Sequence, residues 1–165
     1  MKLLPTTDVR TFDATRRTLD IVLEHYNRVH ETYGVLWLSA ATTKVINNAA
    51  TKINVFDSAE SEGITASSAD DKLTVISAGT YLVEGHISIS ASGGSGNVTC
   101  QAYRNGSVIA VAASKAWVGS GEFADLRVNT IGKVEAGDYI ELYCLGGGGL
   151  TFDVAACSLI VKRLA

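Results

Sequence analysis

The pattern of hydrophobic and polar residues changes in kind near Gly34. Before this glycine, apolar or aromatic residues recur at intervals of three or four. They are Phe12, Leu19, Val22, Tyr26, Val29 and Tyr33. Such spacing forms one stripe along a helix of about three heptads. The stripe therefore predicts an α-helix from Asp8 to Tyr33, with Gly34 as the left-handed residue that ends it.

This predicted helix needs a partner, because an isolated helix of this length is only marginally stable in water. Three partners are open: other copies of the same helix, the rest of its own subunit, or the surface of another protein. Tyr26 and Tyr33 are bulky for the seam of a coiled coil, which weakens the first option. We interpret residues 1–34 as an N-terminal anchor segment, with the six stripe residues as its contacts.

After Gly34 the pattern becomes that of β-strands in a single domain, residues 35–165. Polar spacers and glycines separate short apolar runs, which predict strands at 35–38, 44–46, 52–56, 73–76, 81–90, 97–103, 107–113, 123–131, 139–145 and 150–161. The residues between 57 and 72 are rich in Ser, Ala, Glu and Asp and are predicted as a long surface loop. So many short strands at this spacing indicate an antiparallel sandwich or jelly roll.

Two local signals sharpen this prediction. Between Tyr81 and Ser90 the residues alternate, with Tyr81, Val83, Ile87 and Ile89 on one face of the strand. Asn105-Gly106 provides the two positive φ angles that a two-residue type I′ hairpin turn requires. The fold class is therefore mainly β, with one N-terminal helix.

Composition excludes several classes of protein. The 165 residues are 47% hydrophobic and 19% charged, which is typical of a globular chain and not of a disordered one. A net charge of −3 gives no electrostatic footprint for nucleic acid or an anionic membrane. No apolar run reaches the ~18 residues of a membrane span, and Pro5 interrupts the short apolar start. We expect a chain made in the cytoplasm, without membrane insertion.

No set of residues predicts catalysis, a cofactor or a metal site. Gly93 to Gly96 lies between two strands, where a glycine-rich stretch is a hairpin tip and not a phosphate loop. His86 alternates with Glu84 and Ser88, which predicts a solvated or intersubunit polar face. The acidic residues between 57 and 71 lack the spacing of a calcium loop. Cys100, Cys144 and Cys157 lie in apolar runs and are predicted as buried thiols. We therefore expect no enzyme.

Aromatic and apolar residues on both faces of the late strands point to subunit contacts. A sandwich hides one face of each sheet, so large residues on the other face need a partner. Tyrosine suits such an interface because it combines a large contact area with one polar tip. The predicted interface residues are Tyr81, Tyr139, Tyr143 and Phe152.

Four motifs in a fixed order carry a resemblance to a known family. They are Gly79-Thr80-Tyr81-Leu82-Val83, the stretch from Ala102 to Ile109, the stretch from Val134 to Leu142, and Phe152 followed by Leu159-Ile160-Val161. The region from Lys44 to Leu164 resembles the globular head of complement proteins and the tumour-necrosis-factor superfamily, in the version found in bacteriophage virion proteins. This resemblance implies a jelly roll that forms a homotrimer and a non-enzymatic role.

The resemblance implies two locations in a virion. In the first, the trimer is a capsid decoration or cement protein that binds the major capsid protein or another virion protein through its N-terminal segment. In the second, it is the tip of a tail fibre that contacts a host surface glycan or receptor. Loops at 93–96, 116–121 and 146–149 would make that contact. A cellular secreted ligand is the third option, which the missing signal peptide and the unpaired cysteines disfavour.

Overall fold

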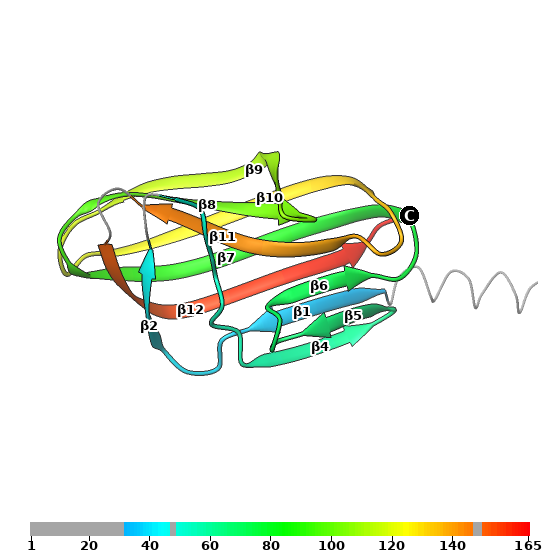
Figure 1. Ribbon diagram of the computed structural model, residues 1–165, viewed down its shortest axis with the longest axis horizontal. Helices are drawn as coiled ribbons and strands as arrows, with labels where there is room; N and C mark the ends of the chain where they lie inside the picture. Colours follow the sequence, from blue (N-terminus) through cyan, green and yellow to red (C-terminus); the bar gives the residue numbers. More distant parts are fainter. Residues whose placement is uncertain (1–31, 47–48, 147–149) are drawn as a thin grey trace, which may run out of the picture.

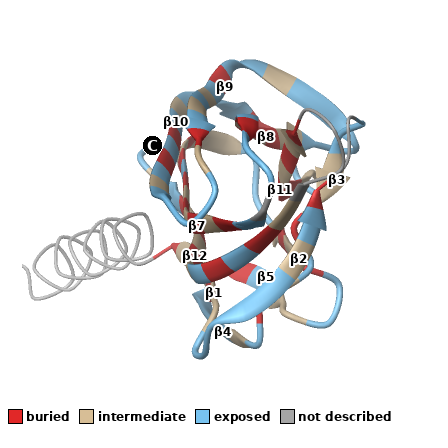
Figure 2. Cartoon of the chain, turned by 90° about the vertical axis from the view of Figure 1, so that its left-hand side faces the viewer, coloured by how far each residue is buried: buried red, intermediate tan, exposed pale blue. Residues whose placement is uncertain are grey.

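The computed structural model describes residues 32–46, 49–146 and 150–165, which form two antiparallel sheets packed as a sandwich (Figures 1 and 2). Sheet A contains β1 (Tyr33–Trp37), β2 (Thr42–Ile46), β4 (Ser58–Glu62), β7 (Gly79–Gly93), β10 (Phe123–Val134) and β12 (Leu150–Arg163). Sheet B contains β3 (Thr51–Lys52), β5 (Ile64–Ser67), β6 (Lys72–Val75), β8 (Gly96–Arg104), β9 (Ser107–Val118) and β11 (Tyr139–Gly146). The antiparallel sandwich predicted from the sequence is confirmed.

The order of strands in each sheet determines which strands lie at the edges of the sandwich. Sheet A runs β10-β7-β12-β1-β4, and β2 continues the line of β1 along β12. Sheet B runs β5-β6-β11-β8-β9, and β3 lies beside β11. The edge strands β9 and β10 therefore lie next to each other along one side of the sandwich (Figure 2).

The core lies between the sheets and follows the predicted alternation. On β7 the side chains of Tyr81, Val83, Ile87 and Ile89 are buried, while Leu82, Glu84, His86 and Ser88 face outward. The other strands contribute fully buried residues in the same way. They include Leu36, Leu73, Val98, Leu126, Ile140, Leu142 and Leu159. Burial of these side chains supplies the main driving force for folding.

The predicted hairpin between β8 and β9 is confirmed. Asn105 and Gly106 have φ angles of 52° and 74°, as a type I′ turn requires. The Asn105 side chain also ties this turn to the next one, because its Oδ1 accepts a hydrogen bond from the Tyr139 N–H at 2.9 Å and its Nδ2 donates to Asp138. These contacts, with the Glu135 N–H, hold the pKa of Asp138 below its usual range.

The predicted surface loop between residues 57 and 72 is wrong in part. It contains β4 and β5, of which β4 is almost wholly exposed. Nothing in its Ser-Ala-Glu-Ser-Glu sequence favours a strand. It forms one because the open edge of β1 pairs with it, from Tyr33 opposite Glu62 to Trp37 opposite Ser58. Conversely, Lys52 is the only residue of the predicted strand 52–56 that belongs to a strand, the two-residue β3.

The predicted helix from Asp8 lies outside the described residues except at its end, and there the prediction is wrong. Tyr33 and Gly34 belong to β1, so the predicted boundary between residues 34 and 35 cuts through a strand. Gly34 does not adopt a left-handed conformation. Its role is close packing, because a Cβ there would lie 2.8 Å from Cγ2 of Ile64 in the facing sheet.

The two ends of the sandwich carry different parts of the chain. At one end the Thr32 carbonyl accepts a hydrogen bond from the Arg163 N–H, so the described N-terminal residue lies beside the C-terminus. The β7–β8 and β9–β10 turns lie at the other end, joined by a bond from the Gly121 N–H to the Ala91 carbonyl. Figure 1 shows the C-terminus at the right and these turns at the left.

Candidate interaction surfaces

The four predicted interface residues divide into two pairs. Tyr81 and Phe152 are fully buried inside the sandwich, so their prediction as interface residues is wrong. Tyr81 uses its polar tip internally, since its hydroxyl donates to the Ser77 carbonyl at 2.7 Å. Tyr139 and Tyr143 are half-buried on the solvent face of sheet B. The predicted anchor residues Phe12, Leu19, Val22, Tyr26 and Val29 lie outside the described residues.

Tyr33, the sixth predicted anchor residue, has a different setting from the one expected. It stands on the outward face of β1 and donates a hydrogen bond from its hydroxyl to Oε1 of Glu60 at 2.7 Å. That bond and the nearby carboxylate charge raise the pKa of Tyr33. Its role in the described structure is to join β1 to the edge strand β4.

An apolar surface lies along the side where β9 and β10 meet, and we call Val108, Val111 and Ile131 the edge patch. Their exposed fractions are 46%, 77% and 62%. They line a groove of about 500 Å³, whose other lining residues include Arg104 and Lys133. Large exposed aliphatic residues gathered in one groove are typical of a surface that another molecule covers.

A bulge in β9 creates this groove. Gln101 of β8 pairs with Ala113, and Tyr103 pairs with Val108. Four residues of β9, 109–112, therefore lie opposite Ala102 alone. Such an insertion bends a strand away from its partner. The sequence signal was the uninterrupted run Val108-Ile109-Ala110-Val111-Ala112-Ala113, which lacks the alternation of a strand with one solvated face.

A second apolar surface lies on the outward face of sheet A near its other edge. Val35 and Trp37 of β1 stand beside Ile160 of β12, and all three are half-buried; we call them the face patch. Glu60 of β4 pairs with Val35 in register, and Glu62 lies two residues along the same strand. The face patch thus has an acidic border, whereas the edge patch has basic residues in its lining.

A polar hollow of about 350 Å³ lies on the same outward face, between β10, β7 and β12. Its lining includes Glu84, His86, Arg127 and Ser158. Nε2 of His86 lies 3.4 Å from Oδ1 of Asp125. Hydrogen bonds from Ser88 and then from His86 lower the pKa of Asp125. The predicted polar face around His86 is present, and its residues are solvated in the single protomer.

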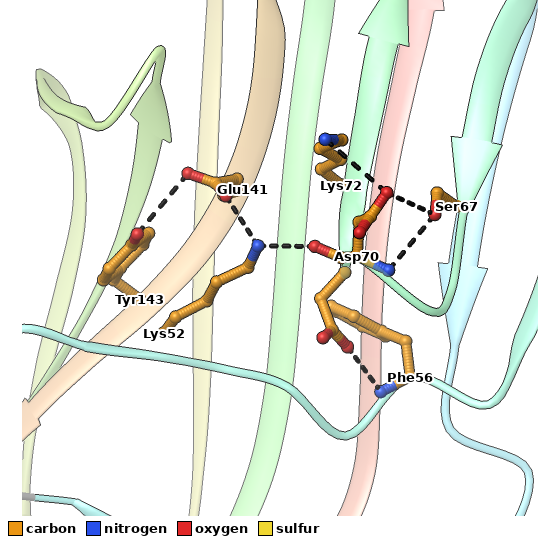
Figure 3. Close-up of polar contacts among 8 residues, drawn as sticks. Lys52, Phe56, Ser67, Asp70, Lys72, Glu141 and Tyr143 are labelled. Atoms are coloured by element: carbon orange, nitrogen blue, oxygen red, sulfur yellow. Dashed lines mark hydrogen bonds and ion pairs between the residues drawn. The ribbon is translucent and has the colours of Figure 1, made fainter.

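The solvent face of sheet B carries a network of polar contacts (Figure 3). Glu141 of β11 is 6% exposed although it faces outward. Lys52 reaches it from β3, with Nζ 2.6 Å from Oε1, and the Tyr143 hydroxyl lies 3.4 Å from Oε2. The Tyr103 and Tyr143 rings stack with centroids 4.1 Å apart and planes at 28°. The residue pattern predicted Tyr143 as a surface contact residue but missed both Tyr103 and the buried carboxylate of Glu141.

Lys52 also connects this face to the turn before β6. Its ammonium donates to the Asp70 carbonyl as well as to Glu141 (Figure 3). The adjacent Asp71 is 7% exposed, has a φ of 49°, and accepts a hydrogen bond from the Phe56 N–H. Burial raises the pKa of Asp71, and the bond from Phe56 opposes that rise. These contacts hold the segment between β3 and β4 against the sandwich.

The described residues contain no group of three or more His, Cys, Asp or Glu side chains placed to hold a metal ion. The three cysteines are free and buried, as predicted. Burial raises the pKa of Cys157, and a hydrogen bond with Cys100 together with burial raises that of Cys144. A raised pKa keeps a thiol protonated and unreactive. Among the described residues, no helix is long and apolar enough to span a membrane.

Comparisons with known proteins place the fold but not the family. No protein-family model matches the chain, and no curated protein matches it. Among solved structures, the Eiger TNF of S. frugiperda matches 81% of this chain and 94% of its own, with a TM-score of 0.57 and 10% identity. Murine APRIL at pH 5.0 matches 79% and 98%, with a TM-score of 0.48 and 13% identity. The first of these two matches shows that the β-domain has the jelly-roll fold of tumour-necrosis-factor-like proteins.

Proposed function

We propose that this chain is a non-catalytic structural protein whose β-domain associates with two further copies into a closed trimer. The observation that carries the proposal is a pair of apolar patches on different sides of the sandwich, one where β9 meets β10 and one on the outward face of sheet A. The edge patch lies beside β10, the first strand of that sheet, and the face patch lies on β1 and β12, next to β4, the last. The trimeric resemblance of the sequence supports the same assembly.

Two different patches on one chain favour a ring. When the edge patch of one copy covers the face patch of the next, the contact is head-to-tail, and such contacts generate rings where the rotation closes. The charges favour this pairing over edge to edge or face to face. Lys133 lines the edge groove, and Glu60 borders the face patch, so unlike charges meet in the head-to-tail contact.

Sedimentation velocity at micromolar concentration tests the assembly. We expect a trimer for the full chain and a folded monomer for Val111→Asp, because the substitution places a charge at the most exposed aliphatic residue of the edge patch. Ile76→Asp is the matched control, since Ile76 is 57% exposed and lies in neither patch. A trimeric Val111→Asp, or a monomeric full chain, would refute the proposal.

A charge exchange tests which surfaces meet. Lys133→Glu alone and Glu60→Lys alone should each weaken the trimer, because like charges then face each other across the contact. The double variant should recover part of the loss. Independent effects of the two changes would show that these residues do not meet.

We further propose that the trimer decorates a virus capsid and attaches through the residues that precede β1. The sequence resemblance supports this location. The two ends of the β-domain suit this attachment, because Thr32 lies at one end and the β7–β8 and β9–β10 turns lie at the other. Attachment at the first end would display the second. The same arrangement of the two ends suits the alternative, a tail-fibre tip that contacts a host surface with these turns.

Gel densitometry of purified particles separates these two locations, since a decoration protein occurs in many copies per particle and a fibre tip in few. Deleting residues 1–31 tests the attachment. We expect the truncated chain to remain trimeric and to lose binding to particles that lack the protein. Binding equal to that of the full chain would refute the anchoring role.

A further inference from the structure

We propose that the solvent face of sheet B is a saccharide-binding surface. Its platform consists of Tyr103, Tyr139 and Tyr143, with Glu141 and Lys52 as its fixed polar contacts. The site lies on sheet B, whereas the face patch lies on sheet A. Its Tyr103 pairs in register with Val108 of the edge patch, but none of its five residues belongs to either association patch.

The three tyrosines lie on the same outward face of sheet B. Tyr139 and Tyr143 alternate along β11, and Tyr103 of β8 pairs in register with Glu141 between them. The rings of Tyr103 and Tyr143 stack at 4.1 Å, which restricts both side chains before any ligand arrives. The ammonium of Lys72 lies 5.6 Å from the centroid of the Tyr139 ring. Rings already held in place lose little conformational entropy on binding.

The polar groups of the platform are equally fixed. Glu141 lies between Tyr139 and Tyr143 on β11 and pairs with Tyr103 of β8. Its carboxylate is held by both Lys52 and Tyr143 (Figure 3). A carboxylate has about four lone-pair sites and an ammonium has three protons. Two acceptor contacts and two donor contacts are used here. The Lys52 side chain is 29% exposed and retains one proton for a ligand hydroxyl, whereas the Glu141 carboxylate is almost fully buried and serves to hold Lys52 in place. Gln101, which pairs with Tyr143 in register, adds an amide on the neighbouring strand.

This combination matches a sugar better than it matches other partners. A pyranose ring has an apolar C–H face that packs on an aromatic ring and a rim of hydroxyl groups that pair with carboxylate, ammonium and amide groups. Binding sites in general combine aromatic walls with a few fixed polar groups. Nucleic acid would require a basic surface, and the centre of this one is a carboxylate. A large protein interface would require an apolar centre.

An array of bacterial and animal oligosaccharides, followed by titration of the strongest one in saturation-transfer NMR, tests the proposal. We expect binding by the full chain and a loss of about tenfold or more in affinity for Tyr103→Ala, which removes one ring of the stack. Tyr103→Phe keeps the ring and should stay within about threefold of the full chain. It also guards against a variant that fails to fold.

Trp117→Ala is the matched control, because Trp117 is an aromatic residue 62% exposed on the same face but lies beyond the platform. We expect it to bind as the full chain does. Two results would overturn the proposal: no oligosaccharide bound at about millimolar concentration, or an affinity that Trp117→Ala reduces and Tyr103→Ala does not. The monomeric Val111→Asp variant keeps all five platform residues and should still bind the oligosaccharide, which separates this test from that of the trimer.

Discussion

The ion pair between Lys52 and Glu141 offers a sharp test of what holds the segment between β2 and β4 to the sandwich. Lys52→Met keeps the aliphatic stem and removes the ammonium, which leaves a carboxylate that is 6% exposed with only the Tyr143 hydroxyl at 3.4 Å. Loss of one charge-assisted hydrogen bond costs about 1.5–3 kcal/mol, and loss of the bond to the Asp70 carbonyl costs about 1 kcal/mol more.

Water hydrogen bonds make up part of the lost free energy, because the Lys52 side chain is 29% exposed. We therefore expect Lys52→Met to lower the free energy of unfolding by about 2 kcal/mol, equivalent to a fall in Tm of about 4–8 °C for a chain of this size. Urea unfolding at pH 7 measures it, with an unchanged m-value as the sign that only stability has changed. In a double-mutant cycle with Glu141→Gln, the coupling should be about 1–2 kcal/mol.

Lys72→Met is the matched control. Its ammonium lies 3.6 Å from Asp70, but the two side chains are 36% and 62% exposed, so the change should cost less than about 0.5 kcal/mol. If Lys52→Met costs no more than Lys72→Met, or if the cycle with Glu141→Gln shows no coupling, the reasoning about the buried pair is wrong.

Three further substitutions probe other parts of the fold. Burial raises the pKa of Asp71 in the folded state. The ionised carboxylate therefore destabilises the fold at pH values above that pKa. This destabilisation disappears as the pH falls below 3.8, the ordinary pKa of an aspartate. Asp71→Asn should therefore raise the free energy of unfolding at pH 7, measured with urea, by less than about 1 kcal/mol and leave it unchanged near pH 3. An equal gain at both pH values would contradict this cause. Gly85→Ala places a Cβ 2.7 Å from Leu142 and Val128, and calorimetry should show a loss of about 1–3 kcal/mol. Asn105→Ala removes the hydrogen bonds to Asp138 and to the Tyr139 N–H, and it places alanine at a φ of 52°. Thermal unfolding should therefore show a loss of about 1–2 kcal/mol in the free energy of unfolding. A Tm equal to that of the unchanged chain would show that the Asn105 side chain does not stabilise the fold.

Much of the sandwich follows from local sequence. The alternation from Tyr81 to Ser90 decides which side chains of β7 enter the core, because successive residues of a strand point to opposite faces. Asn105-Gly106 fixes a hairpin because both residues accept positive φ angles. The apolar runs around Cys100, Cys144 and Cys157 determine that the thiols are buried.

What covers each face was decided only by tertiary structure. The sequence indicates that β11 and β12 have large residues on both faces, but not which face meets the other sheet. Phe152 thus became core, while Tyr143 stayed at the surface. The strand β4 exists because β1 offers it an edge, a pairing between residues about 25 apart that no local pattern encodes.

The two proposed interaction surfaces also depend partly on local sequence and partly on tertiary structure. The run from Val108 to Ala113 is visible in the sequence as an apolar stretch without alternation. Its exposure depends on the bulge opposite Ala102 and on the approach of β10, which belongs to the other sheet. Likewise, Lys52, Tyr103 and Glu141 come together only when β3, β8 and β11 pair. Local sequence determines which side a residue faces, whereas contacts between distant strands determine what it meets there.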